Sequence, residues 1–177
     1  MNIRGIGLWL VLCLTCTLIP NVLAAQVAND NPSVTAQLDQ TKMTVAKIKK
    51  DAAKMQSFTR GKLDWQSHRV VLETIKADVN KLQENMRGLQ SHRTEASPWQ
   101  QDAIDRITGL ANDLATNMNN AIDQLNKSKS TPTAPPYPEY LDANYQIVSD
   151  LQATINSTID FAQTKAKMDV LQAQLPG

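Results

Sequence analysis

The chain has 177 residues, of which 42% are hydrophobic and 20% charged, enough for the core of one domain of ordinary size. Its 18 basic and 17 acidic residues nearly cancel, so the overall charge does not favour the phosphate backbone of a nucleic acid. The composition therefore indicates a single globular domain and argues against a general nucleic-acid-binding protein.

Residues 1–24 have the pattern of a secretory signal peptide. Arg4 supplies a positive charge near the start, residues 6–19 form an apolar run, and residues 22–24 form a small-residue cleavage site. The apolar run is short for a membrane-spanning helix, which needs about 20 residues. We therefore predict an exported protein, located in the periplasm or outside the cell.

Cleavage after Ala24 would remove Cys13 and Cys16, the two cysteines of the chain. The mature chain would then have no disulfide and no thiol, and it would have 17 basic residues against 17 acidic ones, because the signal contains one of the 18 basic residues. Lipid attachment to Cys16 is the alternative, but Thr15 stands before it, where such a signal normally has Gly, Ala or Ser. The polar residues 25–32 that follow are predicted to be flexible.

A first helix is predicted over residues 33–59, because Asn31 is a good N-cap and Pro32 suits a first helical turn. Its apolar positions repeat at alternating steps of three and four and form one stripe, called a seam below. The seam consists of Val34, Leu38, Thr41, Val45, Ile48, Ala52 and Met55. Gly61 is expected to end this helix in a left-handed conformation.

A second seam has the same spacing and runs from residue 65 to residue 89. It consists of Trp65, His68, Leu72, Ile75, Val79, Leu82, Met86 and Leu89. Continuing the first seam would instead place apolar residues at positions 59, 62 and 66, so the phase changes near Gly61. We therefore expect a helical hairpin, and one continuous helix over residues 33–92 is the alternative.

The clearest helix covers residues 97–125. Ser97 and Gln100 have the spacing of a capping box, and Pro98 lies between them at the first helical position. Its seam consists of Ile104, Ile107, Ala111, Leu114, Met118, Ala121 and Leu125. Residues 92–96 form a short connection into this helix.

Residues 127–138 contain four prolines and are predicted to form an extended loop. A fourth helix is predicted from Glu139 to about Ala173. Its seam, with steps of three, four and four, consists of Val148, Leu151, Ile155, Ile159, Ala162, Ala166, Val170 and Ala173. The second half of this seam is rich in alanine, so we expect weak packing at its C-terminal end.

Four amphipathic helices joined by two short connections and one longer one predict an all-α fold. We expect an antiparallel up-down four-helix bundle with coiled-coil-like seams over residues 33–174. Two long hairpins that associate as a dimer, or a longer coiled coil, are the alternatives.

Patterns that indicate an enzyme are scarce. A mature chain without cysteine offers no thiol nucleophile, and the sequence has no glycine-rich phosphate loop and no Glu-x-x-His pair repeated on two helices. Asn126 and Asn156 each match the glycosylation tripeptide, which also arises often by chance. We therefore predict a protein that is not an enzyme.

Basic residues are expected to gather at one end of the bundle. They are Lys47, Lys49, Lys50, Lys54, Arg60, Lys62, Lys127 and Lys129. One interpretation is a patch for an anionic membrane or polymer surface. The favoured interpretation is that cations near helix C-termini offset the helix dipole.

His68 is the polar member of the second seam, and antiparallel packing places it near Met55 and Met118. Histidine and methionine can ligate haem iron, so these three residues are the candidate ligand-binding residues. The favoured alternative is a neutral histidine bonded to Asn144, a tyrosine hydroxyl or water, because large seam residues on either side would fill a haem cavity.

The favoured function is that of an exported, non-enzymatic helical bundle without a cofactor, which acts through protein contacts in the cell envelope or extracellular space. Long helix faces of mixed charge offer surfaces for a protein partner, whereas no pattern indicates nucleic acid or metal. A bundle that binds haem or another apolar ligand is the alternative, and an enzyme is the third possibility.

Overall fold

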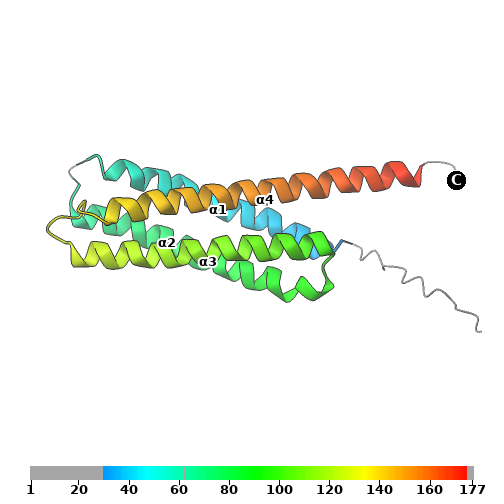
Figure 1. The fold of residues 1–177 in the computed structure, drawn as a ribbon, viewed down its shortest axis with the longest axis horizontal. Helices are drawn as coiled ribbons and strands as arrows, with labels where there is room; N and C mark the ends of the chain where they lie inside the picture. The colour runs from blue at the N-terminus through cyan, green and yellow to red at the C-terminus, as the bar shows by residue number, and fades with distance from the viewer. Residues whose placement is uncertain (1–29, 62, 175–177) are drawn as a thin grey trace, which may run out of the picture.

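The computed structural model describes residues 30–61 and 63–174, and these form four long helices that pack side by side (Figure 1). The helices are α1 (Pro32–Phe58), α2 (Trp65–Ser91), α3 (Pro98–Lys127) and α4 (Tyr137–Ala173), and a short 3-10 helix (Arg93–Glu95) connects α2 to α3. Each long helix contacts its two neighbours, and α4 closes the ring against α1. The predicted all-α four-helix bundle is confirmed. The predicted signal peptide lies outside the described residues.

Capping residues fix where the helices begin. The Asn31 side chain accepts a hydrogen bond from the Ser33 amide at 2.9 Å, as its N-cap position predicts. Asp64 caps α2 in the same way by accepting from the Ser67 amide at 2.8 Å. At α3, the amide of Ser97 donates to the Gln100 side chain at 3.1 Å, which is one half of the predicted capping box.

The predicted hairpin between the first two helices is present, but Gly61 does not end α1 as expected. None of the described glycines has a positive φ, and the C-cap Thr59 is right-handed. Turn hydrogen bonds close the end of α1 instead, from the Arg60 amide to the Ser57 carbonyl and from the Gly61 amide to the Phe58 carbonyl, both at 3.2 Å.

The proline-rich loop is shorter than predicted and is not extended. Amide-to-carbonyl bonds of 2.9–3.1 Å join Thr131 to Ser128, Ala134 to Thr131, and Tyr137 to Ala134, so the segment is a succession of turns. Helix α4 begins at Tyr137, two residues before the predicted start, with Pro138 in its first turn. Proline is tolerated there because the amides of the first turn have no intrahelical partner.

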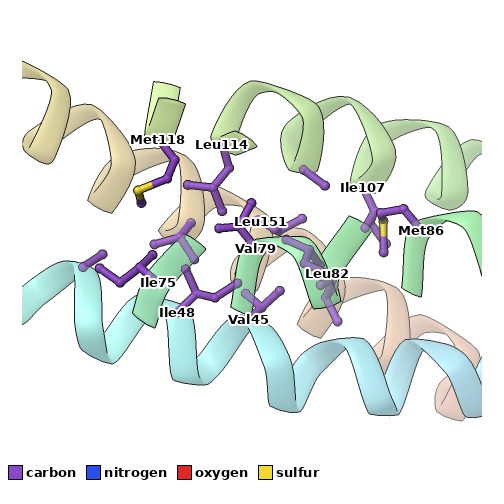
Figure 2. Close-up of a cluster of buried hydrophobic side chains, with 14 of the residues drawn as sticks. Val45, Ile48, Ile75, Val79, Leu82, Met86, Ile107, Leu114, Met118 and Leu151 are labelled. Atoms are coloured by element: carbon purple, nitrogen blue, oxygen red, sulfur yellow. The ribbon is translucent and has the colours of Figure 1, made fainter. Parts of the chain in front are cut away.

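The seams of α1, α2 and α3 are buried as predicted, apart from the half-buried Trp65. Figure 2 shows side chains from these seams and Leu151 of α4 gathered in the centre of the bundle. The buried face of α4 begins earlier than predicted, with Tyr137, Leu141 and Asn144, and it ends at Ile159.

The last turns of α4 are less covered than the rest of the helix. Ala162 is half-buried, whereas Ala166, Val170 and Ala173, which continue the same seam, are exposed. Helix α4 has 37 residues against 27 in α1, and its C-terminal end runs past the other helices (Figure 1). The predicted weak packing of this end is confirmed.

Candidate functional site

His68 lies in the core at the end of the bundle where α1 ends and α4 begins. Its side chain is fully buried, and its Nδ1 atom lies 3.1 Å from the hydroxyl oxygen of Tyr137, the first residue of α4. The rings of Phe58 and Tyr137 both pack edge-on against the imidazole, each at a centroid distance of 5.4 Å. Three helices therefore meet at this histidine.

The environment of His68 favours its neutral form. Burial lowers the pKa of His68, and the charge of Asp64, one turn earlier on α2, only partly opposes this effect. Burial also raises the pKa of Tyr137, so its hydroxyl keeps its proton. A neutral His68 can then accept a hydrogen bond from the Tyr137 hydroxyl at Nδ1 and carry its own proton on Nε2.

Polar atoms without a partner remain beside this hydrogen bond. His68 Nε2 and both polar atoms of the Asn144 side chain are buried and have no hydrogen-bond partner among the described residues. Of the three partners suggested from sequence, the tyrosine hydroxyl is the one that bonds to His68. Tyr137 was not singled out for this role, because it was assigned to the proline-rich loop.

Met55 and Met118, the other two candidate ligand residues, are core residues with 1% of their surface exposed. A haem bound to His68 would have to displace the two aromatic rings that pack against the imidazole. Haem binding stays a prediction, which titration can test: a Soret band lost in His68→Leu and kept in His92→Leu would support it.

The low pKa of His68 predicts that stability depends on pH. Below about pH 6.5, the ordinary histidine pKa, the unfolded chain takes up a proton that the folded chain resists. The free energy of unfolding should therefore fall as the pH drops from 7.5 to 5.5. Urea unfolding of the parent and of His68→Leu at these two pH values measures the effect; an equal pH dependence in both proteins would contradict the assignment.

A second polar cluster ties the start of α1 to α3 and α4 at the other end of the bundle. The Asp30 carboxylate accepts from Ser97 Oγ at 2.7 Å and from Trp99 Nε1 at 2.6 Å, and Lys165 Nζ lies 3.2 Å away. Burial raises the pKa of Asp30, but the hydrogen bonds from Ser97, Trp99 and Lys165 together lower this pKa below its usual value.

The buried Gln100 side chain holds the next residue of the chain. Its Oε1 accepts a hydrogen bond from the Asn31 amide at 2.8 Å, and its Nε2 donates to the Asn31 carbonyl at 3.0 Å. The part of the predicted flexible segment that is described is therefore held in place.

Ser97→Ala should destabilise the bundle by about 0.5–2 kcal/mol, the usual cost of losing a helix N-cap. The change also removes the bond from Ser97 to Asp30. Thermal or urea unfolding measures the effect. Ser91→Ala, at an exposed serine near the end of α2, is the control and should change little.

Of the basic residues predicted at one end of the bundle, Lys62 lies outside the described residues. Lys47 pairs with Asp78 on α2 at 2.8 Å, whereas Lys49 donates to Gln152 on α4 at 2.9 Å. These two lysines of α1 therefore point to different neighbouring helices. An anionic membrane or polymer surface stays a prediction.

The C-terminal part of α4 carries most of the large apolar side chains that are exposed in the described residues. Phe161, Met168, Val170 and Leu171 are each at least half exposed, with 50–63% of their surface accessible. The Phe161 ring packs edge-on against the Trp99 ring at a centroid distance of 5.1 Å, and the last turns of α4 run past the ends of the other helices (Figure 1).

In residues 30–61 and 63–174, no group of three or more His, Cys, Asp or Glu side chains is placed to hold a metal ion. No helix in these ranges is long and apolar enough to cross a membrane. The sequence matches no known protein family and no curated protein, and the fold matches no solved structure.

Proposed function

We propose that the protein is an exported, non-enzymatic helical bundle that binds another protein through the C-terminal end of α4. The observation that carries the proposal is the distribution of exposed apolar residues. Of the seven large apolar side chains exposed in the described residues, four lie between residues 161 and 171: Phe161, Met168, Val170 and Leu171.

The spacing of this surface suits a helical partner. Ala162, Ala166 and Val170 continue the seam that α4 uses inside the bundle, where helices α1 and α3 cover it. Beyond residue 166 the same stripe has no covering helix. An amphipathic helix of another protein, with its own apolar stripe, would restore the packing that the bundle provides further along α4.

Charges around the stripe are mixed, which suits a partner of mixed charge. Lys165 is engaged with Asp30 at 3.2 Å and with Asp169 at 2.8 Å, and Lys167 borders the hollow formed with Ala166, Val170 and Leu171. Polar residues at the rim of an apolar contact set its orientation and exclude wrong partners more than they add affinity.

The size of the surface favours a different protein over a second copy. Eight residues from 166 to 173 span about 12 Å at 1.5 Å per residue. Two copies paired only along this length would bury well under the roughly 1,200 Å² of a stable interface. A partner that also covers the neighbouring side of the bundle would reach that area.

Export and the absence of catalysis rest on the sequence. Residues 1–24 have the pattern of a signal peptide, and a chain that loses them has no cysteine. No catalytic spacing of side chains was found from the sequence, so binding, not chemistry, is the activity that we propose.

Site-specific photo-crosslinking in the organism that encodes the protein tests this function. A photoreactive residue at Leu171 should capture one discrete chain, whereas the same residue at the exposed Val70 of α2 should not. The captured chain is then purified, and its affinity is measured. Val170→Glu, which changes the stripe itself, should weaken binding at least tenfold, while Val70→Glu leaves it unchanged. Equal capture at both positions, or an affinity that is the same in Val170→Glu, would overturn the proposal, and capture of a second copy would replace it with self-association.

A further inference from the structure

A hollow of about 330 Å³ lies between α2 and α3 at the end of the bundle that carries the proline-rich loop. Its base is formed by Leu72 and Leu125 of the buried core and by Ile122, which packs against that core. Its rim is polar and is lined by Arg69, Glu73, Asn126 and Lys129. The half-buried indole of Trp65 forms one wall. The hollow is thus a small recess with an apolar base, close to the lower size limit of ligand pockets.

Two cations stand over the same indole ring at the edge of this recess. The Arg69 guanidinium carbon lies 5.3 Å from the ring centroid of Trp65, and Lys129 Nζ lies 4.9 Å from it. Both distances are within the range of cation–π attraction. The Trp65 indole therefore attracts two positive charges, and both of these side chains line the recess.

Only one of these cations has an anionic partner. Arg69 Nε pairs with Glu73 at 2.7 Å, an exposed ion pair of the kind that contributes little stability. It leaves the other guanidinium donors free, since the bond uses Nε alone. Lys129 forms no ion pair with any carboxylate of the described residues. An anion bound in the recess would give Lys129 an ion-pair partner and could also pair with the remaining Arg69 donors.

We propose that this recess binds a small amphiphilic carboxylate. The carboxylate lies between Arg69 and Lys129, and the apolar body lies on Leu72, Ile122 and Leu125. A cavity of this volume holds a body of about ten to fifteen non-hydrogen atoms, smaller than a drug-sized ligand. The site is at the opposite end of the bundle from the apolar end of α4, so this inference does not depend on the proposed protein contact.

Tryptophan N–H resonances in NMR spectra of the ¹⁵N-labelled full chain provide the test, with octanoate as the probe. The chain contains three tryptophans, and Trp→Phe variants assign their indole signals. Octanoate should shift the Trp65 signal in a saturable manner. The Trp99 signal should stay in place, because that indole donates to Asp30 at the other end of the bundle. Octan-1-ol, which has the same tail without the charge, should shift Trp65 at least fivefold less at equal concentration.

Charge-removing variants connect the response to the two cations. Arg69→Gln and Lys129→Gln should each weaken octanoate binding at least fivefold, whereas Lys47→Gln, at a lysine paired with Asp78, should not. An equal response to octan-1-ol, an equal shift of Trp99, or unchanged affinity in Lys129→Gln would overturn the proposal. Vesicles of phosphatidylcholine and phosphatidylglycerol form a further arm: a Trp65 shift with vesicles and none with octanoate would identify a membrane surface as the ligand and also overturn it.

Discussion

His68→Leu is expected to destabilise the bundle by about 1–3 kcal/mol at pH 7.5, even though leucine is apolar and the site is buried. The substitution removes the hydrogen-bond partner of the Tyr137 hydroxyl, which is itself fully buried. A buried hydroxyl left without a partner costs its full desolvation free energy. The sequence alone suggests that this substitution would be tolerated, because it shows a polar group on an apolar seam but not the tyrosine that bonds to it.

The double variant His68→Leu/Tyr137→Phe separates this explanation from a simple packing defect. Removing both polar groups leaves neither member of this pair buried without a partner, so most of the lost stability should return. Tyr137→Phe alone should also cost stability, because it leaves His68 Nδ1 buried without its partner, while His68 Nε2 already lacks one. Urea unfolding of the four proteins gives the coupling energy. If the losses of the two single variants simply added, the hydrogen bond would not account for them.

Helix positions could be predicted from sequence because the information is local. The seams of α1, α2 and α3 repeat every three or four residues, and the same residues are buried. Capping residues such as Asn31 act within one turn, so their effect can be recognised from the neighbouring sequence alone.

The beginning of α4 was harder to predict, because two local signals conflict there. Pro138 favours a loop, whereas Tyr137, Leu141, Asn144 and Val148 follow the helical spacing of four, three and four. The helix forms because proline needs no amide partner in a first turn, and because Tyr137 gains burial. The helical spacing alone therefore extends the seam of α4 back to Tyr137.

Pairings between distant residues depend on the packed bundle, so the sequence did not reveal them. His68 and Tyr137 are 69 residues apart, and so are Asp30 and Trp99. The first contact depends on how α2 and α4 are staggered at one end of the bundle, and the second on how α1 and α3 are staggered at the other. The stagger of the helices also makes the C-terminal end of α4 project beyond α1 (Figure 1). The sequence pattern therefore does not show that the apolar residues at this end of α4 are exposed.

Leu114→Ala is expected to cause the largest loss of stability of the substitutions considered, about 2–5 kcal/mol. Leu114 lies in the middle of α3 with no exposed surface, close to Met118, Val79 and Leu151 in the centre of the bundle (Figure 2). Alanine removes three carbon atoms from a site that four helices enclose, so the surrounding side chains can fill the cavity only in part. A native domain is stable by only about 5–15 kcal/mol, which makes this a large fraction of the total.

Leu171→Ala provides a matched control, because the same substitution is made at a leucine that is 63% exposed near the end of α4. Its cost should stay below about 0.5 kcal/mol, since no cavity forms and alanine favours a helix as strongly as leucine. Urea unfolding should show a lower midpoint for Leu114→Ala with an unchanged slope, and thermal unfolding should show a melting temperature lower by about 4–20 °C, at roughly 2–4 °C per kcal/mol for a chain of this size. Equal effects at the two leucines would mean that residue 114 does not face the core. In that case the seam that places α3 against α2 and α4 would be wrong.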